Sequence, residues 1–254
     1  AASDVYKRQV REGLDFIRDV IGPVIADAVR DSSGIALKPM IRRALHKREE
    51  MHSRNTAATL LFSQELTPHL LNLSTQADDR VKQTLAFLKQ SDYFFLRLSM
   101  AAAKATADGA HGVAESSVVT AMTISCQDFA IRVSGLDGWF RGPPAIADDV
   151  KLFDGFGRED VEWVGGESHI TETIGLGGFA QAAAFPLQAY QGGSPQAMVD
   201  LNQAMYDITV GENEHYRIPY LQYRGTPTGI DVFRVCLLYT SDAADEGLGV
   251  DLGG

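Results

Sequence analysis

Cysteine is scarce in this chain of 254 residues, which contains only Cys126 and Cys236. Cys236 lies in a terminal segment that we interpret below as non-native, so no internal disulfide is expected. The absence of disulfides is typical of a reducing compartment, and the sequence predicts a cytoplasmic protein. A lone cysteine in a predicted turn is more often structural than nucleophilic, so Cys126 receives no role.

Long apolar runs and an excess of basic residues are also missing. No uninterrupted apolar stretch approaches the ~18 residues that a membrane-spanning helix needs. Lysine and arginine together number 23, against 33 aspartates and glutamates, which gives a net charge of −10. Nucleic acids and anionic membranes attract basic surfaces, so neither is expected as a partner.

The two ends of the chain do not read as natural protein sequence. Residues Ala1–Gln9 are the translation of a transposon sequencing-adapter end, and CLLYTS at 236–241 is the translation of that end in the opposite orientation. We therefore expect residues 1–9 and 236–254 to be adapter-derived, and residues 10–235 to be a metagenomic library fragment.

The spacing of apolar residues changes midway along the chain. Residues 10–112 show helical periodicity, with Pro23 interrupting the first helix. After that point β-branched and alternating segments begin. The sequence therefore predicts an α+β fold, with a helical domain at 10–112 and a mixed α/β domain with a small sheet at 113–235.

The mixed half contains several expected elements. An antiparallel strand pair is predicted at 117–124 and 129–133, and Ser194 is expected to cap a helix that starts at Pro195. The remaining expectations are a short strand at 161–164, a helix from about Gly178, an end to the Pro195 helix at Gly211, an extended segment at 218–223, a polar turn at 224–231 and a strand beginning at 230–235.

The charged segment HKREEMHSRN supports three interpretations. One is a solvated surface segment, and another is a polar site that uses His46, His52, Arg54 and Asn55, in which Arg54 and Asn55 would bind an anionic substrate. The third is a metal site, but His46 and His52 are six residues apart, which does not match the H-E-x-x-H spacing. No metal ligand is assigned.

The stretch ITETIGLGGFAQAAA combines Glu172 and Thr173 with the glycines Gly175, Gly177 and Gly178. Glycines before a predicted helix let backbone N–H groups approach an anion closely, so we expect one wall of an anion site here. The similarity to a dinucleotide fingerprint is superficial, because no buried apolar strand precedes it. No cofactor is predicted.

Two further polar segments bear on chemistry. Ser168 and His169 are adjacent on a predicted extended chain and would point to opposite faces, and GGESHI lacks the closing glycine of G-x-S-x-G, so we reject a serine hydrolase. Anion binding is expected from Arg132 on a strand and from the turn RGTPTGID, the second through Arg224, Thr226, Thr228 and Asp231.

Several motifs together resemble the YlbE/AllG-like family: FFLRLSMAAAKA, SSVVTAM, FAIRVSGL, MYDITVGEN and RGTPTGIDV, besides ITETIGLGGFAQAAA. The resemblance covers residues 10–235. In the family, the segment at His46 reads closer to HxGDExHNRN, so Arg48, Glu49 and Ser53 depart from the pattern. The family is similar to one subunit of oxamate carbamoyltransferase and runs longer at both ends.

This resemblance implies a subunit of a carbamoyltransferase-type complex in allantoin catabolism. Oxalurate and phosphate would give oxamate and carbamoyl phosphate, and an FdrA-type subunit and a further small subunit would be the partners. His46 and His52 would move protons, and the anion-site residues would bind the small anionic substrate and phosphate. The alternatives are a non-catalytic scaffold for the FdrA-type partner and, with less support, a metal-dependent hydrolase.

Overall fold

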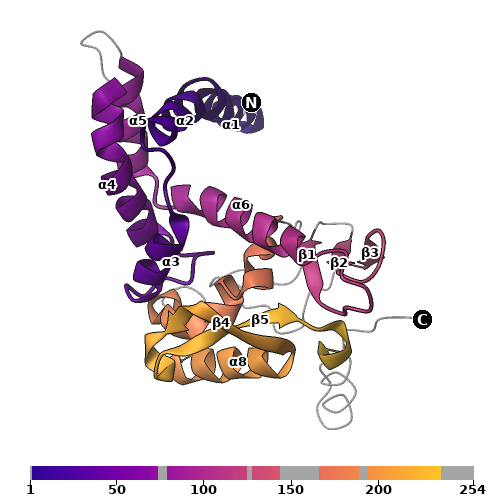
Figure 1. Ribbon diagram of the computed structural model, residues 1–254. Coiled ribbons are helices and arrows are strands. Elements are labelled where there is room, and N and C mark those ends of the chain that lie inside the picture. Colours follow the sequence, from indigo (N-terminus) through magenta and orange to yellow (C-terminus); the bar gives the residue numbers. More distant parts are fainter. Residues whose placement is uncertain (1, 74–78, 125–127, 144–165, 189–193, 236–254) are drawn as a thin grey trace.

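The computed structural model describes residues 2–73, 79–124, 128–143, 166–188 and 194–235, and it has the predicted α+β fold (Figure 1). A π-helical turn, η1 (Ile17–Ile21), precedes Pro23, which accounts for the interruption expected in the first helix. The helices of the first half are α1 (Ala2–Phe16), α2 (Gly22–Asp31), α3 (Leu37–Leu45), α4 (Thr56–Leu73), α5 (Asp79–Gln90) and α6 (Phe94–Gly109).

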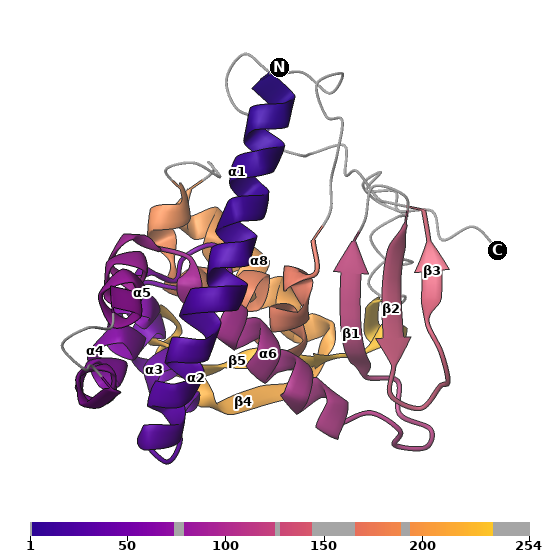
Figure 2. The same cartoon turned by 90° about the horizontal axis from the view of Figure 1, so that it is seen from above.

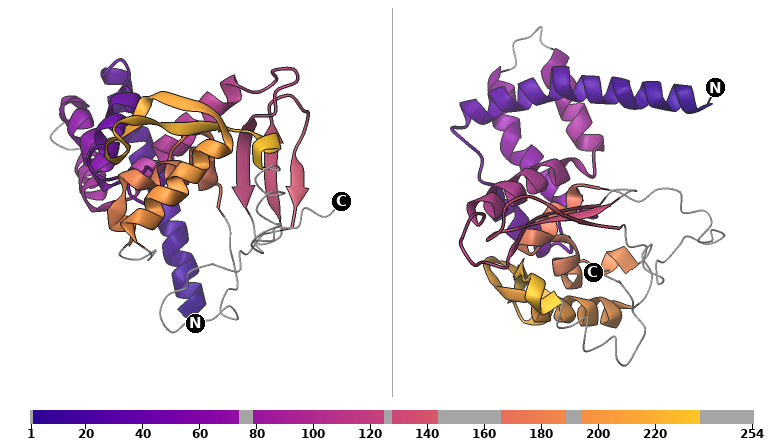
Figure 3. Two further views of the ribbon diagram at one scale, coloured as in Figure 1. Left: turned by 90° about the horizontal axis from the view of Figure 1, so that it is seen from below. Right: turned by 90° about the vertical axis from the view of Figure 1, so that its right-hand side faces the viewer.

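Helix α1 extends away from the rest of the molecule (Figures 2 and 3). Leu14, on this helix, is 61% exposed although it belongs to the apolar stripe of the sequence. No helix in the described ranges is both long and apolar enough to cross a membrane.

A three-stranded antiparallel sheet follows α6 in the chain. It consists of β1 (Val119–Ile124), β2 (Phe129–Val133) and β3 (Phe140–Gly142), in that order. Ile124 pairs with Phe129 next to the connection between β1 and β2, so the predicted strand pair is confirmed. Cys126 and the strand expected at 161–164 lie outside the described residues.

A second, two-stranded sheet replaces several elements that the sequence predicts. Helix α8 (Pro195–Asp207) is capped by the Ser194 hydroxyl as expected, but it ends four residues before Gly211. Three predictions for this part of the chain are wrong. The extended segment expected at 218–223 is mostly a turn, and the polar turn expected at 224–231 is mostly a strand. The strand expected to begin at 230–235 is absent, because 232–235 are helical. In their place are β4 (Thr209–Ile218), the 3₁₀ turn η6 (Pro219–Leu221) and β5 (Arg224–Ile230).

Proline misled the prediction for this sheet. Pro227 sits within β5 opposite Glu212 of β4. In a two-stranded sheet both strands are edges, so a residue without an N–H is tolerated within the strand. The proline and glycines of RGTPTGID are therefore compatible with the edge strand that this segment forms.

The helix expected from Gly178 is also wrong. The chain forms three 3₁₀ segments here, η3 (Ser168–Ile174), η4 (Gly177–Ala183) and η5 (Phe185–Leu187). The buried Asn202 side chain accepts from the Ala182 N–H at 2.9 Å and donates to the Phe179 carbonyl at 3.1 Å. This tertiary partner satisfies backbone groups that a regular α-helix would pair internally.

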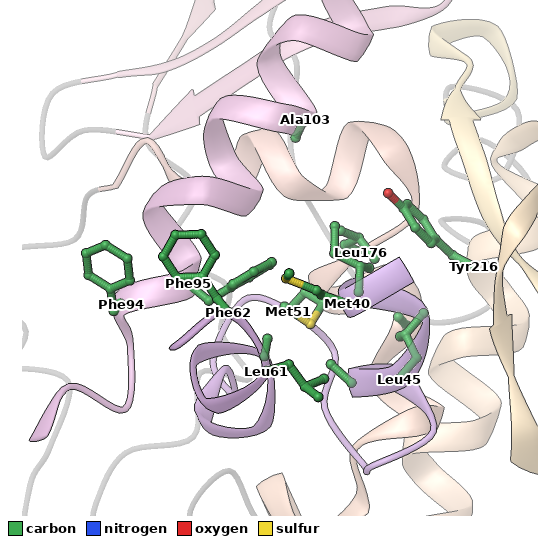
Figure 4. Packing of buried hydrophobic residues seen from close by; sticks show 14 of the residues in the cluster. Met40, Leu45, Met51, Leu61, Phe62, Phe94, Phe95, Ala103, Leu176 and Tyr216 are labelled. Carbon is green, nitrogen blue, oxygen red and sulfur yellow. The ribbon is translucent and has the colours of Figure 1, made fainter. Parts of the chain in front are cut away.

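One hydrophobic core connects the two halves of the chain (Figure 4). Phe62 and Phe95 from α4 and α6 belong to the same cluster as Leu176 and Ile218 from the second half. Helix α6 packs against η3, where the small Ala103 is fully buried. This packing fixes η3, which carries part of the site described below, against a helix of the first half.

Glu49, which departs from the family pattern, has a structural role at the start of α4. Its buried carboxylate accepts from the N–H groups of Ala57 at 2.5 Å and Ala58 at 3.0 Å. Burial raises the pKa of Glu49, and these two hydrogen bonds oppose that rise. A negative charge at a helix start also interacts favourably with the helix dipole.

Replacing Glu49 with Ala should therefore lower the free energy of unfolding by about 1–2 kcal/mol, the size of a lost helix cap. Urea unfolding of the two proteins measures the difference. Glu65→Ala, at an exposed position on the same helix, is the control and should change stability by less than about 0.5 kcal/mol. Equal stability of wild type and Glu49→Ala would show that the cap is unimportant.

Candidate functional site

The segment between α3 and α4 is a tight loop built around the buried carboxylate of Glu50. This carboxylate accepts from the N–H groups of His52 at 3.2 Å and Arg54 at 3.1 Å, and also from that of Ser53. Arg48 and Met51 adopt left-handed backbone conformations, with φ of 67° and 74°. The family pattern has glycine at the position of Arg48, which suits this conformation. The loop holds the His52 side chain in one place.

Glu172, from η3, lies directly against His52. Its Oε1 accepts from His52 Nδ1 at 2.7 Å, and its Oε2 accepts from the Thr171 hydroxyl at 2.7 Å. The Gly178 N–H donates to Oε1 at 3.2 Å. Three donors therefore fix a carboxylate whose side chain is only 10% exposed. The two residues are 120 positions apart in sequence.

The second ring nitrogen of His52 contacts Ser168. His52 Nε2 and Ser168 Oγ are 2.8 Å apart. Because an ionised carboxylate can only accept, Nδ1 carries the proton that is donated to Glu172. In the neutral ring Nε2 is then an acceptor, and the Ser168 hydroxyl donates to it. Ser168, His52 and Glu172 thus form one chain of hydrogen bonds.

A cavity of about 240 Å³ opens beside this chain of hydrogen bonds. His169 is one of its lining residues, and the His52 and His169 rings meet edge to face at 5.8 Å. The volume suits a small molecule and not a polymer. The other lining residues are Glu50, His52, Ser53, Glu172, Gly177, Gly178, Gln181 and Leu187.

The two ionisable partners shift each other's pKa in opposite directions. Burial alone would lower the pKa of His52, but the hydrogen bond and charge of Glu172, with the charge of Glu50, raise it above its usual 6.5. Burial alone would raise the pKa of Glu172, but His52, the Thr171 hydroxyl and the Gly178 N–H lower it below its usual 4.5. Both charged forms are therefore favoured together.

These shifts predict how the pair contributes to stability as pH changes. Because the pKa of His52 is raised, this group stabilises the fold fully at pH values below about 6.5, and the stabilisation is lost as pH rises through the raised pKa. Because the pKa of Glu172 is lowered, this group stabilises the fold at pH values above about 4.5, and the stabilisation is lost as pH falls through the lowered pKa. The difference in unfolding free energy between wild type and His52→Gln should thus be larger at about pH 5.5 than at about pH 8.5. Urea titrations at both values measure it, and a difference that grows with pH would contradict the assignment.

His46 lies apart from His52. It lines a larger cavity of about 460 Å³, together with Arg48 and Tyr220, and its ring meets Tyr223 edge to face at 5.6 Å. Within the described part of the chain, no group of three or more His, Cys, Asp and Glu side chains could hold a metal ion. The structure therefore gives the two histidines different surroundings.

Arg54 and Asn55 support the loop that carries His52. Arg54 Nε donates to the Arg48 carbonyl at 3.2 Å, and Asn55 Nδ2 donates to the His52 carbonyl at 2.7 Å. Asn55 is buried, and its Oδ1 has no hydrogen-bond partner in the structure. Neither side chain is among those that line the 240 Å³ cavity.

Two of the three arginines that were expected to bind an anion, Arg132 and Arg224, pair with carboxylates. Arg132 contacts Asp108 and the Thr120 hydroxyl. Arg224 Nε donates to Glu212 at 2.8 Å, and its guanidinium lies 3.6 Å from the Tyr206 ring centroid. Neither arginine lines the cavity at His52.

The polar segment of β5 meets the glycine stretch through residues other than Arg224. A Cβ on Gly175 would come within 2.5 Å of Thr226 Oγ1 and 2.7 Å of the Pro227 carbonyl, so this approach requires glycine. The Thr228 hydroxyl reaches the Thr173 carbonyl at 3.5 Å, whereas Asp231 accepts from the Phe233 N–H at 3.0 Å. The contact between Thr228 and Thr173 joins β5 to η3, and none of these residues lines the cavity at His52.

The glycine amides are occupied within the protein, which corrects the expectation that they cradle an anion. Gly175 N–H donates to the Glu172 carbonyl at 3.1 Å, and Gly177 N–H donates to the Glu50 carbonyl at 2.7 Å. The Gly178 N–H donates to the Glu172 carboxylate. Gly177 has φ of 62°, and a Cβ there would lie 2.0 Å from Glu172 Oε1. The glycines therefore make room for Glu172.

Sequence reasoning gave Ser168 and His169 no role and placed them on an extended chain, whereas both lie in the 3₁₀ segment η3. They do not pair with each other, as predicted, because His169 Nδ1 lies 3.1 Å from the Gly166 carbonyl. Ser168 instead reaches a histidine 116 residues away. No local spacing signals such a partner, so only the fold reveals it.

Comparisons with known proteins place this chain in a family. Residues 4–168 match the sequence model described as oxamate carbamoyltransferase subunit AllG. The chain is 40% identical over 231 residues to a protein of Escherichia coli K12 named uncharacterized protein YahG, covering 90% of this chain and 48% of that protein. It is 34% identical over 223 residues to oxamate carbamoyltransferase subunit AllG of the same organism, covering 87% and 53%.

A crystal structure of a conserved protein of unknown function from Enterococcus faecalis V583 has a similar fold. The TM-score is 0.80 at 39% sequence identity, covering 89% of this chain and 54% of that one. The chain spans about half the length of the curated relatives it matches. With a family match over more than half of its residues, the chain belongs to the AllG family.

Proposed function

We propose that the chain is part of a subunit of a carbamoyltransferase-type complex in the breakdown of allantoin. The reaction would convert oxalurate and phosphate to oxamate and carbamoyl phosphate, or would be a related transfer of a carbamoyl or acyl group. Membership of the AllG family and the 34% identity to the AllG subunit support this proposal. The partners would be an FdrA-type subunit and a further small subunit, in the cytoplasm.

The observation that carries the proposal is the hydrogen-bonded pair of His52 and Glu172 beside a small cavity. Carbamoyl transfer from a nitrogen to an oxygen requires a proton to reach the departing nitrogen. A histidine fixed by a carboxylate can accept a proton and return it at a defined position. Acid–base catalysis of this kind contributes about 10²–10⁴-fold to the rate.

The pair also suits the size and charge of the substrates. Oxalurate is a small anion, and a cavity of about 240 Å³ can hold a molecule of that class. Against the effect of burial, the hydrogen bond and charge of Glu172 raise the pKa of His52, which favours the imidazolium that forms when this histidine accepts a proton. His169 lines the same cavity and presents a second imidazole.

The test is turnover by the full-length parent protein assembled with its neighbouring subunits. Oxalurate and phosphate are supplied together and separately, and oxamate and carbamoyl phosphate are both quantified. The proposal expects stoichiometric formation of the two products when both substrates are present. Failure of the complete wild-type complex to form either product would overturn oxalurate and phosphate as its substrates.

The scaffold alternative makes a different prediction for the same complex. A subunit that only positions the FdrA-type partner contributes no group to the reaction, so His52→Gln would leave turnover unchanged once the complex assembles. Size-exclusion chromatography confirms assembly, and the rate then separates the two functions.

A further inference from the structure

Ser168 has the surroundings of an activated nucleophile, a role that the proposed function does not require. Its Oγ is 2.8 Å from His52 Nε2, while His52 Nδ1 is 2.7 Å from Glu172. Serine hydroxyls become nucleophilic when a histidine takes their proton and a carboxylate orients that histidine. The same roles recur on unrelated folds and in different chain orders, so geometry is the criterion by which they are recognised.

The groups around Ser168 are held in place rather than merely close together. Glu172 has further donors in the Thr171 hydroxyl and the Gly178 N–H, which fix its carboxylate. The His52 backbone is tied to Glu50, and η3 packs against α6. Ser168 itself is half-buried and is not one of the residues that line the cavity; its Oγ lies next to that space through the His52 imidazole, which does line it. A pre-organised nucleophile requires this kind of support.

We propose that Ser168 carries the transferred group as a covalent carbamoyl ester during the reaction. This inference rests on the proposed function and specifies its mechanism. In this mechanism the subunit is catalytic, and the transfer takes place in two steps at one site. His52 acts as the base and then the acid in each step, and Glu172 is a positioning residue that keeps the proton on Nδ1.

In the first step Ser168 Oγ attacks the carbamoyl carbon of oxalurate. A bond forms between Oγ and this carbon, and the bond from the carbon to the oxamate nitrogen breaks. The hydroxyl proton moves to His52 Nε2 and then to the departing nitrogen, so that neutral His52 and free oxamate result. Ser168 is left as a carbamate ester.

In the second step a phosphate oxygen attacks the carbon of this ester. The new bond gives carbamoyl phosphate, and the bond to Ser168 Oγ breaks. The proton on hydrogen phosphate passes through His52 to Oγ, which restores the serine hydroxyl. Neither step requires an oxidant, a metal or a nucleotide.

A covalent intermediate predicts two measurements on the assembled wild-type complex. Oxalurate without phosphate should release about one oxamate per site in a burst, and mass spectrometry should find a carbamoyl group on the peptide that contains Ser168. Labelled phosphate should exchange into carbamoyl phosphate without oxamate. Direct attack of phosphate on oxalurate permits neither the burst nor the exchange, so their joint absence in an active complex would overturn the proposal.

Variants test the residue itself. Ser168→Ala should reduce kcat by about 10³-fold or more and abolish both the burst and the exchange. Ser63→Ala removes a serine hydroxyl from α4, away from the cavity, and serves as the matched control with wild-type rates. Ser168→Cys keeps a nucleophile and should retain more activity than Ser168→Ala, which shows that the site still folds.

The outcomes separate this proposal from the function on which it rests. Turnover that survives in Ser168→Ala within about tenfold overturns the covalent mechanism and leaves carbamoyl transfer in place. Loss of turnover in Ser168→Ala, together with a labelled Ser168 in the wild type, supports both. A wild-type complex without turnover on oxalurate and phosphate overturns both.

Discussion

Replacing His52 with Gln should reduce the turnover of the assembled complex by about 10²–10⁴-fold, the range lost with a general acid–base. Glutamine keeps a polar side chain of similar size but cannot move a proton. The ring nitrogens of His52 now contact Glu172 and Ser168 at 2.7 and 2.8 Å, so the variant breaks both links. Rates are measured with oxalurate and phosphate at saturation.

His69→Gln is the matched control for this experiment. His69 also pairs with a carboxylate, at 2.8 Å from Asp31, but it lies on α4 and does not line the cavity. The same substitution there should leave the rate within about twofold, because surface ion pairs contribute little. If His52→Gln and His69→Gln turn over equally fast, His52 has no catalytic role.

The companion variant Glu172→Gln separates orientation from proton transfer. An amide at this position can offer a donor to Nδ1, which favours the opposite tautomer of His52 and takes away the acceptor that faces Ser168. In serine proteases the corresponding change reduces the rate by about 10⁴-fold. We therefore expect a loss comparable to that of His52→Gln.

The largest structural effect is expected for Gly177→Ala. A Cβ at Gly177 would lie 2.0 Å from Glu172 Oε1 and 3.1 Å from His52 Nδ1, and φ of 62° strains any residue other than glycine. Glu172 is held by several partners and cannot withdraw without breaking its bond to His52. The expected loss of stability is about 2–5 kcal/mol, which combines overpacking with backbone strain.

Thermal unfolding of this chain measures the effect, with an expected decrease in Tm of roughly 5–15 °C. Gly178→Ala is the matched control for stability, because a Cβ there meets nothing within 4 Å. It should leave Tm unchanged or slightly higher, since alanine restricts the unfolded chain. Equal Tm values for the two variants would show that the space beside Glu172 can adapt.

Local patterns in the sequence predict those elements that are stabilised locally. The strand pair β1–β2 and the Ser194 cap follow from alternation and from Ser-Pro before an apolar stripe, and both are present. The β4–β5 sheet does not follow, because Pro227 and two glycines outweigh the strand signal in RGTPTGID. Pairing with Glu212 and its neighbours, which the sequence does not reveal, decides the outcome.

In the candidate site, too, residue types can be predicted from the sequence, whereas the contacts between distant residues cannot. The sequence singled out His52 as a group suited to proton transfer near neutral pH, and Glu172 only as part of an expected anion site. Their pairing across 120 residues depends on how η3 packs against α6. Arg224 also has the chemistry of an anion-binding residue, but its guanidinium pairs with Glu212 of the neighbouring strand. Side-chain type indicates what a residue can do, and the fold decides whether it does so at the site.

The central claim is that Ser168, His52 and Glu172 act as one catalytic unit, and the double variant His52→Gln/Ser168→Ala tests it most directly. Residues that act in a single step lose their effect once one of them is gone, so their effects do not add. We expect kcat of the assembled double variant to equal that of the slower single variant within about threefold. Losses that multiply across the two substitutions would show that Ser168 and His52 act independently and would contradict the claim.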